Sequence, residues 1–106
     1  MRLEFSGEIW FWRGPSPYHF VTVPAREAAE LDDVAGLVSY GWGMIPVSAT
    51  IGRTTWTTSL FPKDGGYVVP VKDAVRRAEG LDVGDRPTVV LVVEPRQRQP
   101  APGRRA

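Results

Sequence analysis

The chain of 106 residues contains no cysteine and only one histidine, His19. The absence of cysteine excludes disulfide bonds, thiol nucleophiles and thiolate metal sites, and one histidine cannot build a multi-histidine metal centre. No apolar run approaches the roughly 20 residues that a membrane-spanning helix needs. The first residues also lack the apolar core of a signal peptide. These absences predict a cytoplasmic protein with no metal, no other cofactor and no membrane attachment.

Charge is distributed unevenly along the chain. Residues 1–94 carry nine basic and twelve acidic residues, whereas residues 95–106 carry four arginines and no acid. A content of 42% apolar residues is enough for one core, and the length suits one domain. We therefore predict a single domain over residues 1–94 and a disordered Pro/Arg-rich tail over 95–106. The net negative charge of this domain argues against nucleic-acid binding.

Short segments with β-strand character dominate the pattern. Leu3, Phe5, Ile9 and Phe11 alternate with mostly polar residues, which predicts one half-buried strand. Further strands are predicted over 18–23, 44–51, 54–61, 67–69 and 88–94. Short helices are predicted from Pro24 to about Asp33 and from Pro70 to Gly80. The chain is therefore expected to be mainly β, a small closed antiparallel β-barrel with one or two short α-helices.

Aromatic residues are the strongest functional feature, since four tryptophans in 106 residues is a high content. Trp10 and Trp12 continue the polar face of the first strand, and Trp42 lies between two glycines, where backbone can approach a ligand. Two interpretations stay open: a binding surface, or a second small core covered by another segment. Under the first interpretation, we predict a ligand- or partner-binding site formed by Trp10, Trp12, Tyr40, Trp42 and Trp56.

The residue patterns that are typical of catalytic sites are only weakly represented in this sequence. His19 comes early in a strand after a turn, and no serine occupies a nucleophile elbow. Asp64 and Asp85 fall in turns, where their side chains can accept backbone N–H bonds. Oxygen ligands do not cluster at the spacings of a metal site. We predict no catalytic residue and no metal ligand.

Four segments in order resemble a known family, the bacterial "domain of unknown function 1905" family: 43–52, 58–62, 65–70 and 80–85. The resemblance runs from about Arg2 to Glu94. It implies a small closed β-barrel of bacterial origin and carries over no catalytic residue. A shorter stretch, from Tyr67 through Gly80-Leu-Asp-Val-Gly-Asp85 to the following strand, resembles the half-barrel of AbrB-type regulators and antitoxins. Those proteins dimerise by swapping hairpins and bind DNA.

Three functions follow from these observations. The first is an uncharacterised, non-enzymatic β-barrel, monomer or homodimer, that binds a small molecule or a protein partner through its tryptophan-rich surface. The alternative is an AbrB-like swapped-hairpin DNA-binding regulator, in which Arg13, Arg53 and Arg86 form a basic edge. The third is an enzyme of unknown class that works with His19 or with carboxylates such as Asp85.

Overall fold

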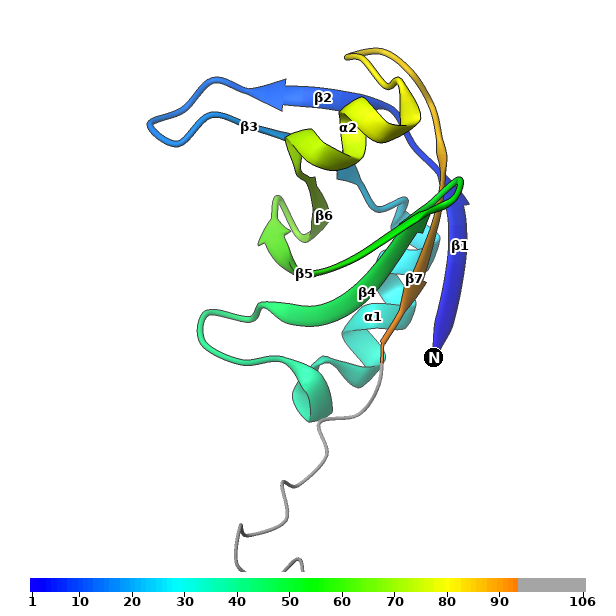
Figure 1. Ribbon diagram of the computed structural model, residues 1–106. Coiled ribbons are helices and arrows are strands. Elements are labelled where there is room, and N and C mark those ends of the chain that lie inside the picture. Colours follow the sequence, from blue (N-terminus) through cyan, green and yellow to red (C-terminus); the bar gives the residue numbers. More distant parts are fainter. Residues whose placement is uncertain (94–106) are drawn as a thin grey trace, which may run out of the picture.

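The computed structural model describes residues 1–93 and folds them into seven strands and two helices (Figure 1). The predicted tail over 95–106 lies outside the described residues. The elements are β1 (Arg2–Ser6), β2 (Ile9–Trp12), β3 (Tyr18–Thr22), α1 (Ala25–Val38), β4 (Ile45–Ile51), β5 (Thr54–Lys63), β6 (Gly66–Val71), α2 (Asp73–Glu79) and β7 (Thr88–Val92).

All the strands pair antiparallel in the order β1-β7-β4-β5-β6-β3-β2. β7 lies between β1 and β4, as its apolar sequence predicted for an interior strand. β1 and β2 form the two ends of the sheet, yet only Gly7 and Glu8 separate them in the chain. The sheet therefore curls until its first and last strands adjoin at this short connection (Figure 1).

The prediction of a closed barrel is wrong, because the sheet is a curled half-barrel. The single strand predicted from Leu3 to Phe11 breaks at Gly7 and Glu8, so β1 pairs with β7 and β2 pairs with β3. The start of β2 bonds to a loop instead: the Ile9 N–H donates to the Asp85 carbonyl at 2.8 Å, and the Gly84 N–H donates to the Ile9 carbonyl at 2.9 Å.

The sheet is also open between the first part of β5 and the end of β6. β5 pairs with β4 through Thr54–Leu60, then bends and pairs with β6 only through Phe61–Lys63. Farther along β6 stands Pro70, which pairs with Phe20 of β3 and has no N–H to offer to a second neighbour. Proline inside a strand therefore marks the place where the sheet stays open.

The core fills the concave side of the sheet. Ile45, Val47, Ala49 and Ile51 are buried on one face of β4, which confirms the predicted alternation. Leu31 of α1 and residues from every strand join the same cluster. Packing of this cluster supplies the main driving force for folding, since burial of apolar area dominates the stability of a domain this small.

Both helices differ from their predicted bounds. α1 continues to Val38 rather than ending near Asp33, because Leu31 and Val38 are buried two turns apart and their packing outweighs the cost of Gly36. α2 starts at Asp73, because Pro70 and Val71 belong to β6. Its C-cap is Gly80 in the left-handed conformation, as predicted. Within residues 1–93, neither helix has the length and apolar character needed to cross a membrane.

Candidate functional site

Aromatic side chains from three strands meet on the face of the sheet that points away from the core. Strand register brings them together, since Trp10 lies opposite Phe20, and Trp12 lies opposite Tyr18. Phe20 is at the centre, with ring centroids 5.3 Å from Trp10, 5.8 Å from Tyr18 and 6.5 Å from Phe61 of β5. Such spacings are those of packed aromatic pairs. We call the five side chains Trp10, Trp12, Tyr18, Phe20 and Phe61 the aromatic cluster.

The aromatic cluster lines two adjoining cavities. The first, of about 390 Å³, lies at the opening between β5 and β6 and is bordered by Pro17, Thr58 and Pro70. The second, of about 230 Å³, is bordered by Lys63 and Val68. Because Trp12, Phe20 and Phe61 line both cavities, the two are parts of one depression.

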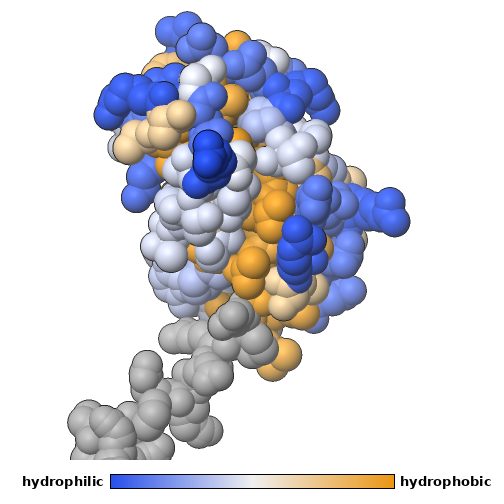
Figure 2. Space-filling model, turned by 45° about the vertical axis from the view of Figure 1, so that its right-hand side comes forward, coloured by the Kyte–Doolittle hydropathy of each residue, from blue (hydrophilic) through white to orange (hydrophobic). Residues whose placement is uncertain are grey.

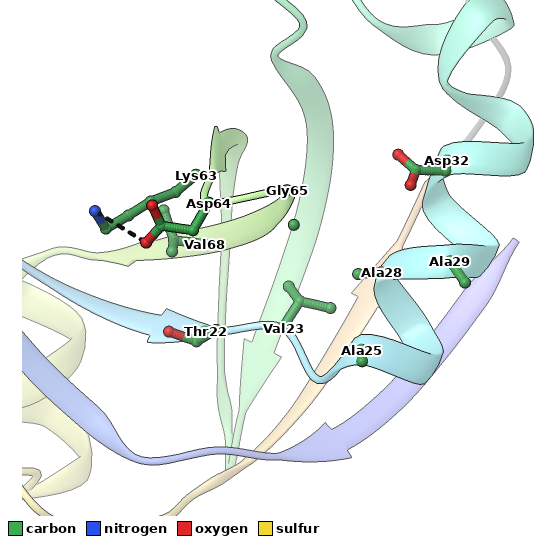
Figure 3. Close-up of a pocket in the computed structure, with 11 residues that line it drawn as sticks. Thr22, Val23, Ala25, Ala28, Ala29, Asp32, Lys63, Asp64, Gly65 and Val68 are labelled. Atoms are coloured by element: carbon green, nitrogen blue, oxygen red, sulfur yellow. Dashed lines mark ion pairs between the residues drawn. The ribbon is translucent and has the colours of Figure 1, made fainter.

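A third cavity, of about 390 Å³, extends this depression toward α1. It shares Lys63 and Val68 with the second cavity and has a floor that includes small side chains of α1. Figure 3 shows Asp32 projecting from α1 on one side, with Lys63 and Asp64 on the other. The Lys63 ammonium lies 3.5 Å from the Asp64 carboxylate. The three cavities together form one elongated groove, whose end at Asp32 and Asp64 we call the acidic end.

Hydrogen-bond donors lie along the aromatic part of the groove. The Trp10 indole N–H donates to the Thr22 hydroxyl at 2.9 Å, which fixes the orientation of its ring. Within the described residues, neither the Trp12 indole N–H nor the Tyr18 phenol donates a hydrogen bond. Partial burial and the nearby Asp73 carboxylate raise the pKa of Tyr18, so the phenol keeps its proton. Two donors are therefore available to a molecule in the groove.

The five residues predicted as a binding site do not all come together. Trp10 and Trp12 lie side by side in the groove, and Trp12 is 41% exposed. Trp56 is only 7% exposed and packs in the core on the opposite face. Trp42 is 92% exposed in the turn before β4. Tyr40 lies in the same turn, where its hydroxyl is hydrogen-bonded to Ser59 at 2.7 Å.

Sequence reasoning missed three members of the groove. Tyr18 and Phe20 alternate along β3 with core residues, so the alternation that identified Trp10 and Trp12 could have identified them too. Phe61 joins from β5, and its place depends on the bend after Leu60. Pro62, next to Phe61, is a local sign of that bend, but it does not show which strand Phe61 will join.

The residues considered for catalysis lie elsewhere. His19 packs against Phe11 with 4.6 Å between ring centroids and the two rings tilted by 54°. Partial burial and the positive charge of Arg76 lower the pKa of His19. The Asp73 and Asp82 carboxylates raise it, but by less. Asp85 accepts the backbone N–H of Asp82 at 2.8 Å, which confirms its predicted role in a turn. Across residues 1–93, no three His, Cys, Asp or Glu side chains gather as a metal-ligand group.

Comparisons with known proteins agree with the family resemblance. No curated protein matches this chain. A family model described as "Domain of unknown function (DUF1905)" matches residues 5–91, which include the aromatic cluster, the acidic end and most of the core. The match covers most of the 106 residues, so the chain belongs to the DUF1905 family, a domain of unknown function.

Proposed function

We propose that this protein is a non-enzymatic binding module that recognises an extended, proline-containing segment of a partner protein. The observation that carries the proposal is the elongated groove, which joins an aromatic part to the acidic end. Grooves lined by aromatic side chains are a recurring way to bind proline-rich segments. Such segments are extended before they bind, so little conformational entropy is lost on binding.

The shape of the groove favours a chain over a compact small molecule. Three shallow cavities follow one another across β3, β6 and β5 toward α1, and neighbouring cavities share side chains. A compact ligand would fill one of them, whereas an extended peptide would contact all three. Trp12, Tyr18 and Phe61 are each 37–42% exposed, so flat ring surface is available to proline rings.

Polar groups along the groove suit a peptide backbone. The free donors of Trp12 and Tyr18 can bond to peptide carbonyls, which remain unpaired in the polyproline II conformation. At the acidic end, Asp32 and Asp64 outnumber Lys63, which favours a positively charged residue of the ligand. The expected ligand is therefore a proline-containing segment with a lysine or arginine near one end.

The test is a titration of the full chain with three synthetic peptides. One is an oligoproline, one is the same oligoproline with two terminal arginines, and one is a glycine–serine peptide with the same arginines. We expect the two proline peptides to shift the indole N–H signals of Trp10 and Trp12 in an NMR spectrum. The arginines should strengthen binding, and Asp32→Asn together with Asp64→Asn should remove that gain.

Matched variants separate the groove from the rest of the surface. Trp12→Ala and Phe61→Ala should each weaken oligoproline binding about tenfold or more, as loss of an aromatic anchor does in other interfaces. Trp42→Ala removes an equally large, more exposed ring outside the groove and should leave binding unchanged. Equal binding of the proline and glycine–serine peptides would overturn the proposal. So would a co-purifying small molecule that shifts Trp10 and Trp12 when no peptide does.

A further inference from the structure

The groove and the C-terminal part of the same chain have complementary chemistry. We infer that residues 95–106 are a ligand of the groove and occupy it in the same molecule, so that this segment competes with any partner peptide. The inference rests on the proposed function, because it assigns an occupant to the same groove. The segment carries Pro95, Pro100 and Pro102 among four arginines and has no acid.

Charge complementarity is the first reason. Residues 1–94 carry three more acidic than basic residues, and residues 95–106 carry four positive charges. Asp32 and Asp64 at the acidic end are both exposed, so arginine side chains can reach their carboxylates. Arginine binds carboxylates through two parallel N–H donors, and Asp64 has only a single lysine contact at 3.5 Å.

The order of residues along the segment is the second reason. After Pro95, Arg96 and Arg98 precede Pro100 and Pro102, and Arg104 and Arg105 come after these prolines. Along the groove, the acidic end lies beside α1 and the aromatic cluster lies beyond it. A chain that enters beside α1 would therefore pass its arginines along the carboxylates before its prolines reach the aromatic rings.

Reach is the third reason. The described chain ends at Val93, which lines a small cavity together with Val34, Leu37 and Val38 in the C-terminal half of α1. Figure 2 shows hydrophobic residues gathered on one face of the molecule. The acidic end lies on the other side of the helix, whose diameter is about 10 Å. The thirteen residues from Glu94 onward span about 40 Å in a polyproline II conformation, and the two shorter dimensions of the molecule are each 29 Å.

A nitroxide label on the segment tests the inference in the full chain. Because the protein has no cysteine, Ala101→Cys gives a single labelling position. The matched control carries the same label with Arg96→Glu, Arg98→Glu, Pro100→Ser and Pro102→Ser. These changes lie outside every described element, and the backbone amide spectrum of residues 1–93 checks that the fold is unchanged. We expect the label to broaden the Trp10 and Trp12 indole signals at least threefold more with the native segment than with the control.

Each outcome decides the matter. Equal broadening in the native and control chains would overturn the inference, because it would reflect only the tethering of the label. Broadening that appears only when labelled chains are mixed with unlabelled, isotope-enriched chains would place the segment in the groove of a second copy and overturn the intramolecular assignment. The control chain should also bind the arginine-bearing oligoproline at least threefold more tightly than the native chain.

The same peptides separate the two proposals. If the segment leaves Trp10 and Trp12 unaffected while the oligoproline still shifts their signals, the inference fails and the proposed function stands. If neither the segment nor any peptide affects the two tryptophans, both fail.

Discussion

The phenol of Tyr67 in β6 donates a hydrogen bond of 3.0 Å to the carboxylate of Asp32 in α1. This bond links the helix to the sheet at the acidic end of the groove. Burial raises the pKa of Tyr67, and the bond to Asp32 and the charge of that carboxylate raise it further. The phenol therefore stays protonated, and remains a donor, throughout the neutral pH range.

Tyr67→Phe should destabilise the protein modestly. It keeps the ring in the core and removes only the donor, so the expected loss in the free energy of unfolding is about 1 kcal/mol, typical of one hydrogen bond. Urea denaturation measures the loss. In the double-mutant cycle, Asp32→Ala removes the acceptor and should have less effect in the Tyr67→Phe background than alone. Additive losses would mean that the bond contributes nothing to stability.

Trp56 should prove to be a structural residue. It is 7% exposed, and its indole N–H is buried without a partner among the described residues. Trp56→Ala should lower the free energy of unfolding by about 3–5 kcal/mol, as large-to-small changes in a core do. Trp56→Phe should cost less than about 1.5 kcal/mol, because it also removes an unsatisfied buried donor. Urea denaturation compares the two variants.

Trp42→Ala is the control for Trp56, since the Trp42 side chain is 92% exposed. It should change the free energy of unfolding by less than about 0.5 kcal/mol. A loss for Trp42→Ala comparable to that of Trp56→Ala would contradict the assignment of Trp56 to the core and of Trp42 to the surface.

Most of the fold was predictable where one physical signal decided it. Residues 45–51 bury every second side chain against the core, so period-two alternation was sufficient. The break at Gly7 and Glu8 was not predictable, because Phe5, Gly7 and Ile9 keep the alternation of a single strand. Pro70 precedes a helical pattern and so predicts the start of a helix, although it lies in β6 beside the opening of the sheet.

The candidate site was predictable only in part, for a related reason. Trp10 and Trp12 share one face of one strand, which the sequence displays directly. Trp56 is surrounded by threonines, which suit either face of a strand, so nothing local showed that its side chain points into the core. Phe61 joins the groove through the pairing of β5 with β6, and such pairing between strands is a long-range property that single-sequence patterns do not contain.

Stability should fall as pH decreases through the range in which His19 titrates. Its pKa in the folded protein lies below the ordinary value of 6.5, because partial burial and Arg76 disfavour the charged ring. The unfolded chain therefore binds more protons between these two pKa values, so the folded state loses stability as pH falls from about 6.5 through the folded pKa. Well above pH 6.5 the imidazole is neutral in both states, so the effect is absent.

Thermal denaturation between pH 7.5 and 5 measures this dependence. His19→Gln removes the titrating group and should flatten the profile over that window, while the acid-induced loss from carboxylates at lower pH remains. An NMR titration of the imidazole checks the direction of the shift independently. A folded His19 pKa above 6.5, or an unchanged profile in His19→Gln, would contradict this prediction.

Gly14→Ala should impair the groove without weakening the core. A β-carbon at Gly14 would overlap Cζ2 of the Trp12 indole, so the ring would have to move. Trp12 lines both cavities of the aromatic part, and its displacement should weaken oligoproline binding at least threefold. The free energy of unfolding should change by less than about 1 kcal/mol, because the exposed ring is free to shift. The matched control is Gly36→Ala, which meets nothing within 4 Å and lies in α1 outside the residues that line the groove. It should leave binding unchanged and stabilise the helix by about 0.5–1 kcal/mol. If Gly14→Ala binds the peptide as the native chain does, the position of the Trp12 ring does not determine recognition.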